Sequence, residues 1–568
     1  MCQFGFPDDT QFVIDTRNLE LKSVLRYLES NKWKKLFFNG KFEGTFFYHY
    51  FDTPINNVFD AQVVERIINP SSLGDVSLED VVMKYCDVKL DKETRKSFYG
   101  GQAGPFTEKQ INYGADDVKY LFSIYEQQSA VLKEKQSEHI ADLENALVTV
   151  VALMEVVGVP VDANKWKEIL KDYIIEHEES RQRLLAILLD KPEEDFQPVG
   201  TQQTLFGGEE TTLLPTSLNL NSPAQLKVAF KRLGIDLKST DNQVISLIRH
   251  PAAEELVKYR ELQKLISSYG QESFLDKIHP FTGRIHPNWR QLGAETGRFS
   301  CRAPNMQQIP EKLRKAIGGE KDWVLLGADF SQMELRILAQ ESKDPVLVEA
   351  FTTGKDIHTT TATVMFDTPA EKVTKEQRYA AKTLNFGITY GMQVKKFTDM
   401  MNAEAKKEGK KPITIAQASN LMDKYRATYR VANRYLDSIG QFALTQGYVE
   451  TRFGRKRWFH PVDTRLDPRK YAAQIASIKR AGANMPIQGT NADITKMAMI
   501  DIHNELRSYG FKASIILQVH DEIVLLVHKS QVESIKPIIV NAMINAGKTL
   551  LPDIPVIVEP YVSNYWPK

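Results

Sequence analysis

The first part of the chain alternates short apolar runs with helical stretches. Phe12–Ile14 and Lys35–Phe38 are apolar runs of strand length, and residues 11–125 around them carry helical spacing. The turn-rich segment Asn69–Asp75 interrupts this region. The pattern predicts a small α/β domain.

The middle of the chain is helical in pattern. Apolar residues recur with helical spacing from Glu138 to about Val157, and a charge-rich helical pattern continues from Trp166 to Leu189. Between 191 and 217 the sequence turns to Pro, Gly, Thr and acidic residues, which predicts a long surface loop. Helical spacing resumes at Ser222-Pro223, where Ser is suited to cap a helix and Pro to its first turn, and runs to about Asp276.

Length and composition make this a multidomain protein. The 568 residues exceed one hydrophobic core, and a prior of about 100 to 200 residues per domain suggests three to five units. The hydrophobic share of 42% and the charged share of 26% are ordinary for globular proteins, and no apolar run is long enough to cross a bilayer. We therefore expect no membrane role.

Charge, cysteine content and the N-terminal residues bear on the kinds of site and on the cellular compartment of the protein. Three widely separated cysteines predict neither a disulfide framework nor a zinc site. The formal charge of +1 means that any footprint for nucleic acid is local. The N-terminal residues lack a secretory signal and are too acidic for a transit peptide. We expect the cytoplasm of a bacterial or phage-infected cell, and an organelle stays open.

Asp329 follows a short apolar run at Val324–Ala328. The next residues, Phe-Ser-Gln-Met-Glu-Leu-Arg, change from strand spacing to helical spacing, so Asp329 is expected at the carboxyl end of a strand. It is either a reactive carboxylate or a polar residue that marks a turn. Ser331 and Glu334 also satisfy a helix capping box. The motif alone leaves both interpretations open.

A second segment carries large residues at every fourth position. Four residues turn a helix by about 400°, so such positions form one slowly drifting stripe. Two cations precede two aromatic residues, and two glycines, each costing about 1 kcal/mol in a helix, lie beside the aromatic end. This arrangement suits a nucleoside triphosphate, with its phosphates on the cations and its base on the aromatic end. The stripe consists of Arg378, Lys382, Phe386 and Tyr390.

A second carboxylate is expected at the tip of a hairpin. Ser514–Val519 and Ile523–Val527 are apolar, β-branched runs separated by His520-Asp521-Glu522. Asp is common in turns, so this motif alone does not separate a functional carboxylate from a structural one.

Together the three segments resemble DNA polymerase family A, the polymerase I family. Asp329 through Arg336 is similar to its first palm motif, Arg378 to Gly391 to its fingers helix, and Gln518 to Glu522 to its second palm motif. The resemblance implies a multidomain α/β and α+β protein, with an RNase H-like exonuclease-type domain followed by a right-hand polymerase. It implies template-directed DNA synthesis in replication or repair.

The resemblance also implies domain boundaries. Residues 1–130 would be an incomplete 3′–5′ exonuclease-like domain and 138–284 the thumb. The palm would comprise 285–343 and 481–568, with the fingers at 344–480. The 5′-nuclease domain of many relatives is not found, so removal of RNA primers is not expected.

The residues that carry the chemistry follow from the same resemblance. Asp329 and Asp521 would hold two Mg²⁺ ions, which Mn²⁺ can replace, with Glu522 beside them. One ion would activate the primer 3′-hydroxyl and the other would bind the triphosphate, with Lys382 as the candidate acid for the leaving group.

The implied dNTP-binding residues are Arg378, Lys382, Phe386, Tyr390, His358, Gln332 and Glu334. Of these, Glu334 and Tyr390 would exclude a 2′-hydroxyl, and Phe386 would disfavour dideoxynucleotides. The implied primer-template residues are Arg298, Gln488, His520, Arg480, Asn484 and Tyr390, some of them reading the minor groove without sequence preference. A further basic and aromatic cluster at Arg452–Trp458 suits either template contact or exposed structural charge.

The first domain resembles the proofreading exonuclease but lacks part of its metal site. Its second motif is similar to Asn39-Gly-Lys-Phe-Glu43, where Glu43 replaces an aspartate, and its third to Tyr113-Gly-Ala-Asp-Asp117. An Asp-x-Glu pair on the first strand is missing, since Asp15-Thr16-Arg17 has Arg in place of Glu.

The interval from Asp15 to Asn39 is also less than half that of the family. We therefore interpret Phe12–Asp15 as a later strand, with the metal-binding strand expected upstream of Met1. Negligible proofreading is the expectation.

Two other functions are compatible with parts of the pattern. A single-subunit RNA polymerase shares the palm carboxylates and a similar fingers helix, although Glu334 and the Gln518–Glu522 context favour DNA synthesis. A non-catalytic nucleic-acid clamp would have a degraded palm. We expect a monomer that binds primer-template DNA and dNTPs, and a processivity factor, for example on the 191–217 loop, is left open.

Overall fold

The computed structural model describes residues 1–17, 21–70, 76–91, 93–98, 104–189, 218–387, 390–407 and 409–567. The chain forms two compact units. The first comprises Met1–Val159, His286–Gln308 and Lys321–Asn564, and the second comprises Pro160–Ile285, Ile309–Glu320 and Tyr565–Lys568. The predicted loop at 191–217 and most of the turn-rich segment Asn69–Asp75 lie outside the described residues.

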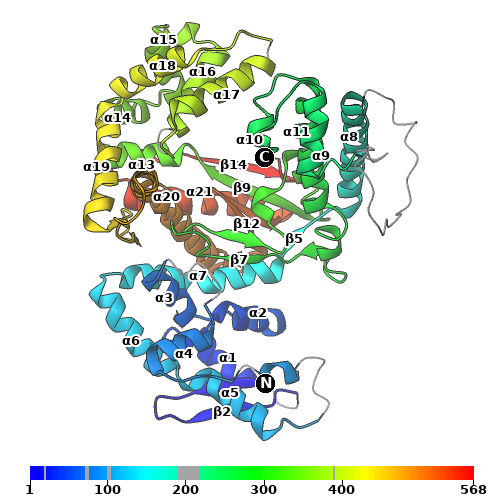
Figure 1. The fold of residues 1–568 in the computed structure, drawn as a ribbon. Coiled ribbons are helices and arrows are strands. Elements are labelled where there is room, and N and C mark those ends of the chain that lie inside the picture. The colour runs from blue at the N-terminus through cyan, green and yellow to red at the C-terminus, as the bar shows by residue number, and fades with distance from the viewer. Residues whose placement is uncertain are drawn as a thin grey trace. The chain divides into compact units, whose positions relative to one another are not determined.

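The N-terminal part of the first unit is the predicted α/β region (Figure 1). Strands β1 (Cys2–Gly5) and β2 (Gln11–Ile14) pair antiparallel, whereas β3 (Lys35–Phe37) and β4 (Val58–Asp60) pair parallel. The two predicted strands are confirmed, and β1 was not predicted. The helices are α1 (Lys22–Glu29), α2 (Gly40–Phe51), α3 (Ala61–Ile68), α4 (Leu78–Cys86), α5 (Glu108–Lys119), α6 (Leu121–Glu134) and α7 (Glu138–Val157).

One buried aspartate orients two of these helices. Asp60 accepts hydrogen bonds from the backbone N–H groups of Gln62 and Val63 at the start of α3. Its two oxygens also accept from the N–H groups of Asn39 and Gly40, at 3.0 and 2.7 Å, where α2 begins. A single carboxylate thus satisfies the exposed donors of two helix N-termini.

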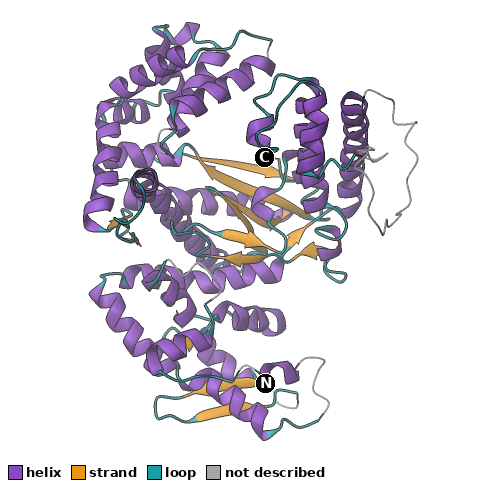
Figure 2. Cartoon of the chain, in the orientation of Figure 1, coloured by secondary structure: helices purple, strands orange, loops and turns teal. Residues whose placement is uncertain are grey.

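A four-stranded antiparallel sheet forms the centre of the first unit (Figure 2). Its order is β12 (Ala513–Val519), β13 (Glu522–His528), β9 (Trp323–Phe330) and β14 (Val558–Ser563). Helices α7, α20 (Pro468–Ser508) and α21 (Val532–Leu550) pack on it. Six of the seven residues of β13 are buried, as expected for a strand covered on both faces. Strands β7 (Asn288–Arg290) and β8 (Ser300–Arg302) also belong to this unit and pair antiparallel.

A helical region lies between β9 and α20 in the sequence. It comprises α13 (Met333–Ser342), α14 (Pro345–Thr352), α15 (Ile357–Phe366), α16 (Lys375–Gly387), α17 (Val394–Lys407), α18 (Ile415–Thr428) and α19 (Arg430–Gln446), followed by the hairpin β10 (Tyr448–Glu450) and β11 (Lys456–Trp458). Asp344 caps α14 and also accepts from the N–H groups of Val431 and Ala432 in α19. It joins two helices in the same way as Asp60.

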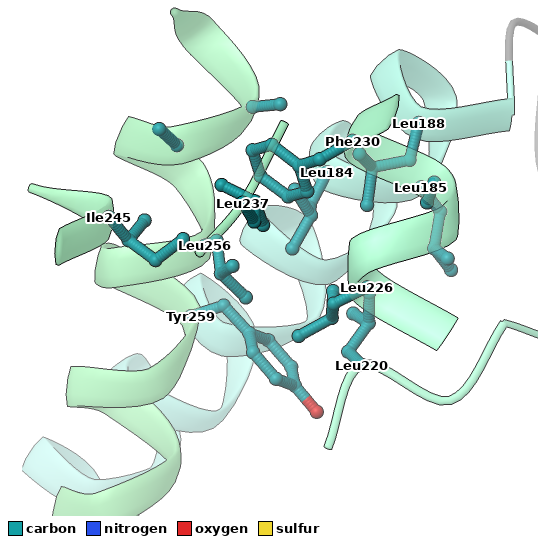
Figure 3. Packing of buried hydrophobic residues seen from close by; sticks show 13 residues of the cluster. Leu184, Leu185, Leu188, Leu220, Leu226, Phe230, Leu237, Ile245, Leu256 and Tyr259 are labelled. Carbon is teal, nitrogen blue, oxygen red and sulfur yellow. The ribbon is translucent and has the colours of Figure 1, made fainter. Parts of the chain in front are cut away.

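The second unit is mainly helical. It contains α8 (Ala163–Leu189), α9 (Pro223–Arg232), α10 (Asn242–Ile245), α11 (Pro251–Tyr269) and α12 (Glu311–Arg314), with the short strand β6 (Arg284–Ile285), while β5 (Val159–Pro160) lies at the border of the two units. The apolar faces of α8, α9, α10 and α11 meet in one core, shown in Figure 3, around Leu184, Leu226, Phe230 and Leu256. The predicted thumb segment 138–284 is therefore divided, with α7 in the first unit and α8–α11 in the second.

The helical region predicted from Ser222-Pro223 to about Asp276 is confirmed as the successive helices α9, α10 and α11. Ser222 caps α9 through its side chain, as predicted. α9 ends near Gly234, whose φ of +77° does not continue a helix. A new helix begins at Pro251, which cannot follow a preceding helical turn without losing a hydrogen bond.

Across the described ranges, no helix is both long and apolar enough to span a membrane.

Candidate active site

Asp329 and Asp521 lie at neighbouring strand ends of the central sheet. Asp329 is the penultimate residue of β9, and it pairs across the sheet with Glu522, the first residue of β13. Asp521 lies in the two-residue turn between β12 and β13, and its carbonyl accepts from the N–H of Phe330 at 3.3 Å. The predicted strand end and the predicted hairpin are both confirmed, with Glu522 in the strand rather than in the turn.

The turn before β13 has a left-handed backbone conformation at His520. His520 has a φ of 58°, at a place where two-residue hairpin turns favour glycine. Gln518, the residue two before it, donates from its amide to the His520 carbonyl at 2.6 Å. Gln307 in turn donates to the Gln518 carbonyl at 3.1 Å. These amides hold the turn in the conformation that presents Asp521.

The two aspartates repel each other. Burial, and then the neighbouring Asp329 carboxylate, raise the pKa of Asp521 well above its ordinary value. A divalent cation between such carboxylates would relieve both effects.

The donor set fits magnesium. Among the described residues, no three His, Cys, Asp or Glu side chains are grouped so that they alone could hold a metal ion. Mg²⁺ is commonly bound by one or two carboxylates together with substrate phosphates. The pair Asp329 and Asp521 supplies what such a site requires from the protein.

Glu522 is fixed by a tyrosine of the edge strand. Its side chain is 5% exposed, and its Oε1 accepts from the Tyr561 hydroxyl at 2.5 Å. Its role as a third metal ligand stays a prediction.

Glu334 is held by two side chains. The Tyr390 hydroxyl donates to Oε2 at 3.0 Å, and Arg298 forms an ion pair with Oε1. Burial, and then the Glu334 carboxylate, raise the pKa of Tyr390. The capping-box alternative for Ser331 and Glu334 is wrong, because α13 begins one residue later, with Gln332 at its N-cap and no side-chain cap. Gln332 instead turns the chain with a φ of 56°.

The predicted stripe is helical over three of its four residues. Arg378, Lys382 and Phe386 are exposed residues of α16. The helix ends at Gly387, so Tyr390 is not on it, and the prediction of one continuous helix is wrong there. Gly391 has a φ of +66°, and the Met392 N–H donates to the Gly387 carbonyl. The chain turns in this segment, and the Tyr390 hydroxyl reaches Glu334.

The two cations of the stripe have different surroundings. Arg378 donates to Asp356 at 2.7 Å, and Asp356 is the N-cap of α15. Lys382 is exposed on the next turn. The aromatic ring of Phe386 lies 5.6 Å from the ring of His358.

His358 is buried and contacts Asn385 of α16. It is 3% exposed, and its Nδ1 accepts from the Asn385 amide at 2.9 Å. Burial lowers its pKa to about 4, and Arg378 and Lys382 contribute. It ties α15 to α16, while its predicted contact with phosphate is not tested.

Three predicted primer-template residues share one helix. Arg480, Asn484 and Gln488 are spaced by four residues on α20, so they lie along one face. The predicted boundary between fingers and palm near residue 481 falls inside this unbroken helix. Arg480 is exposed, Asn484 is half-buried, and Gln488 is 7% exposed.

The Arg452–Trp458 cluster is engaged within the protein. Arg455 is 5% exposed and is ion-paired with Asp493 at 2.8 Å and Glu144 at 2.5 Å. Glu144 also pairs with the buried Lys496. Arg452, Lys456 and Arg457 bind Glu341, the Lys135 carbonyl and Glu295. Neither alternative from the sequence describes Arg455, which belongs to a buried network.

Glu43, whose Oε2 is buried, lies near Asp60 and Asp117. Burial, with Asp60 and Asp117 nearby, raises the pKa of Glu43 to about 8. Burial likewise raises the pKa of Asp117 to about 6. Glu43 Oε2 is buried without a hydrogen-bond partner, and Asn39 begins α2 with a φ of 66°. At neutral pH Glu43 is therefore largely protonated in this structure.

The strand beside the third motif carries no acidic pair. Strand β1 packs on α5, the helix of Tyr113 and Asp117, and its residues are Cys-Gln-Phe-Gly. The Glu43 carboxylate contributes to raising the pKa of Cys2, after burial, so Cys2 lies near this group. Asp15 is partly exposed and is bound by Arg17 at 2.5 Å. Sequence reasoning missed β1, because four residues without alternating polarity give little signal.

The comparisons with known proteins agree with this arrangement. Residues 200–568 match the sequence profile described as DNA polymerase family A. The chain belongs to DNA polymerase family A. Residues 1–133 match the profile of the 3′-5′ exonuclease.

Two DNA polymerase I relatives are similar to this chain in sequence. The chain is 31% identical over 518 residues to DNA polymerase I of Geobacillus stearothermophilus. This alignment covers 87% of this chain and 54% of that protein. The chain is 37% identical over 335 residues to the thermostable DNA polymerase I of Thermus aquaticus, covering 56% and 38%. The chain thus spans about half the length of the first of these relatives.

A solved structure shares the fold. The polymerase domain of Pol1 from M. smegmatis, in complex with a DNA primer-template and dNTP, has a TM-score of 0.78 at 23% identity, covering 98% of this chain and 90% of that one. An exonuclease-type domain followed by a family A polymerase domain is the architecture of this chain.

Proposed function

We propose that this chain is a template-directed DNA polymerase that adds deoxynucleotides to a primer 3′-hydroxyl. The observation that carries the proposal is the half-buried pair Asp329 and Asp521 at neighbouring strand ends. The structural relative solved with primer-template and dNTP supports these as the substrates. Family membership supports the same reaction.

Asp329 and Asp521 would hold Mg²⁺. When bound, the ions lower the pKa of the attacking hydroxyl and neutralise charge on the triphosphate and the leaving pyrophosphate. The chain's own contribution is to fix both carboxylates on a rigid sheet, with the turn at His520 held by Gln518.

Lys382 and Arg378 would bind the triphosphate from α16. Both are exposed cations on one face of this helix, and charge-assisted hydrogen bonds to phosphate are the strong class. Lys382 would also donate a proton to the leaving group. Arg378 can exchange its contact with Asp356 for one with phosphate.

Glu334 would select deoxynucleotides. Tyr390 and Arg298 hold this carboxylate in place, so it cannot move aside for a 2′-hydroxyl. A single-subunit RNA polymerase would require room at this position. Relative incorporation of dNTPs and rNTPs separates the two functions.

Primer extension tests the proposal. A labelled primer on a longer template, with dNTPs and Mg²⁺, should be extended by the wild-type chain and not after addition of EDTA. The Asp521→Ala variant should bind the DNA with unchanged affinity but fail to extend it. DNA binding without extension by the wild type would identify a non-catalytic clamp instead.

We also propose that proofreading is negligible. In the exonuclease-like region burial raises the pKa of Glu43 to about 8, and β1 presents Cys2 and Gln3 rather than an acidic pair. A labelled mismatched primer with Mg²⁺ and no dNTPs should stay intact. Rapid shortening that Asp117→Ala abolishes would overturn this proposal.

A further inference from the structure

Tyr561 lies across a neighbouring strand because that strand has a glycine. Tyr561 on β14 pairs with Gly327 in the middle of β9. A Cβ atom added at Gly327 would lie 2.1 Å from Cζ and 2.2 Å from Oη of Tyr561. Such distances are far inside van der Waals contact, so any larger residue would displace the ring.

The ring thereby reaches the strand beyond. The order of the sheet is β13, β9 and β14, and the Tyr561 hydroxyl donates to Glu522 Oε1 on β13 at 2.5 Å. This length is typical of a hydroxyl bound to an ionised carboxylate. The residue opposite Gly327 on β13 is Val524, two positions from Glu522, so both lie on the face that the ring covers.

Glu522 is placed beside both candidate metal ligands. It follows Asp521 in the chain and lies opposite Asp329 in the register of the sheet. With its side chain 5% exposed, the carboxylate has little freedom to relax into solvent. A group that orients it therefore also sets the charge next to the aspartate pair.

We propose that Tyr561 is a positioning residue of the polymerase site, which holds Glu522 as a fixed negative charge beside Asp329 and Asp521. Gly327 is the residue that makes room for it. The inference rests on the proposed function, because it assigns the role of Glu522 within that site. Partners of this kind around metal ligands typically change metal affinity by about 10- to 100-fold when removed.

Mn²⁺ binding to the full chain tests the proposal without catalysis. The free Mn²⁺ signal in electron paramagnetic resonance gives the dissociation constant. We expect Tyr561→Phe, which keeps the ring and loses the donor, to weaken the tightest site about tenfold. Gly327→Ala should show a similar loss by displacing the ring. Tyr565→Phe is the matched control, since Tyr565 donates to Asp162 at 3.0 Å, a carboxylate outside the site.

A double-mutant cycle identifies the route of the effect. In a Glu522→Gln background, Tyr561→Phe should cause no further loss of Mn²⁺ affinity, because its partner is already neutral. Unchanged affinity in Tyr561→Phe, or an equal loss in both backgrounds, would overturn the inference. Primer extension by the wild type is measured in parallel, so that failure of the polymerase proposal is seen separately from failure of this one.

Discussion

The hydroxyl of Tyr390 lies 3.0 Å from Oε2 and 3.2 Å from Oε1 of Glu334, which joins the segment after α16 to the first turn of α13. Arg298 binds the same carboxylate from a third segment of the chain. Glu334 is therefore fixed from two sides, as a residue that must resist displacement by a substrate hydroxyl should be.

Removal of this carboxylate should weaken sugar discrimination. We expect Glu334→Ala to lower the preference for dNTP over rNTP by roughly 100-fold, because a fixed steric and charged obstacle is lost. The ratio of kcat/KM values for the two nucleotides in single-nucleotide incorporation measures it.

The chain supplies a matched control on the same helix. Glu341 is also bound by an arginine and a tyrosine, Arg452 at 3.1 Å and Tyr435 at 3.2 Å. Glu341→Ala should leave the preference unchanged. An equal change in both variants would mean that the effect comes from α13 as a whole.

Lys382 should contribute mainly to use of the triphosphate. We expect Lys382→Ala to lower kcat/KM for dNTP by roughly 10- to 100-fold, the size of one charge-assisted hydrogen bond. Lys375, an exposed lysine in the first turn of the same helix, is the control, and Lys375→Ala should stay within about twofold of wild type. Comparable losses at both positions would argue for general electrostatic attraction rather than a specific contact.

Glu43 should make stability depend on pH. Its pKa is about 8 in the fold and 4.5 ordinarily, so the unfolded chain releases a proton that the folded chain keeps between these values. Wild type therefore loses stability relative to Glu43→Gln as pH rises from about 5 to 8, by about 1.4 kcal/mol per pH unit. Urea unfolding of both proteins at several pH values measures this slope, and parallel curves would contradict the burial argument.

His358 should act in the opposite pH range. Its pKa is about 4 in the fold, so the unfolded chain binds a proton that the folded chain does not as pH falls below about 6.5. Wild type should lose stability from pH 6.5 toward 4, and His358→Gln, which keeps an acceptor for Asn385, should lose less. His503 is also buried, and its pKa is lowered to about 4. It therefore lowers the stability of wild type and of the variant equally over the same pH range. A slope unchanged by the substitution would mean that His358 is charged in the fold.

Local patterns predicted the strands that carry Asp329 and precede Asp521 well. The hairpin around Asp521 and the strand before Asp329 are set by apolar, β-branched runs, which need no knowledge of distant residues. The spacing of Arg378, Lys382 and Phe386 likewise predicted α16.

Features that depend on distant contacts were not predictable in this way. The hydrogen bond from Tyr390 to Glu334 joins residues 56 positions apart in the sequence. The burial of Arg455 depends on Glu144 in α7, and the place of Tyr561 depends on a glycine of another strand. The spacing of residues along the sequence does not reveal which distant residues come into contact in the fold. The energies of these contacts depend on their neighbours in space.

The most direct test of the polymerase assignment compares two aspartates at opposite ends of one strand. Asp329 lies near the carboxyl end of β9, and Asp322 directly precedes the strand in a turn with a φ of 63°, which Asn also tolerates. In single-turnover incorporation of one dNTP with saturating Mg²⁺, we expect Asp329→Asn to reduce the rate by at least about 1,000-fold and Asp322→Asn to leave it unchanged. A rate in Asp329→Asn equal to that of wild type would contradict the account.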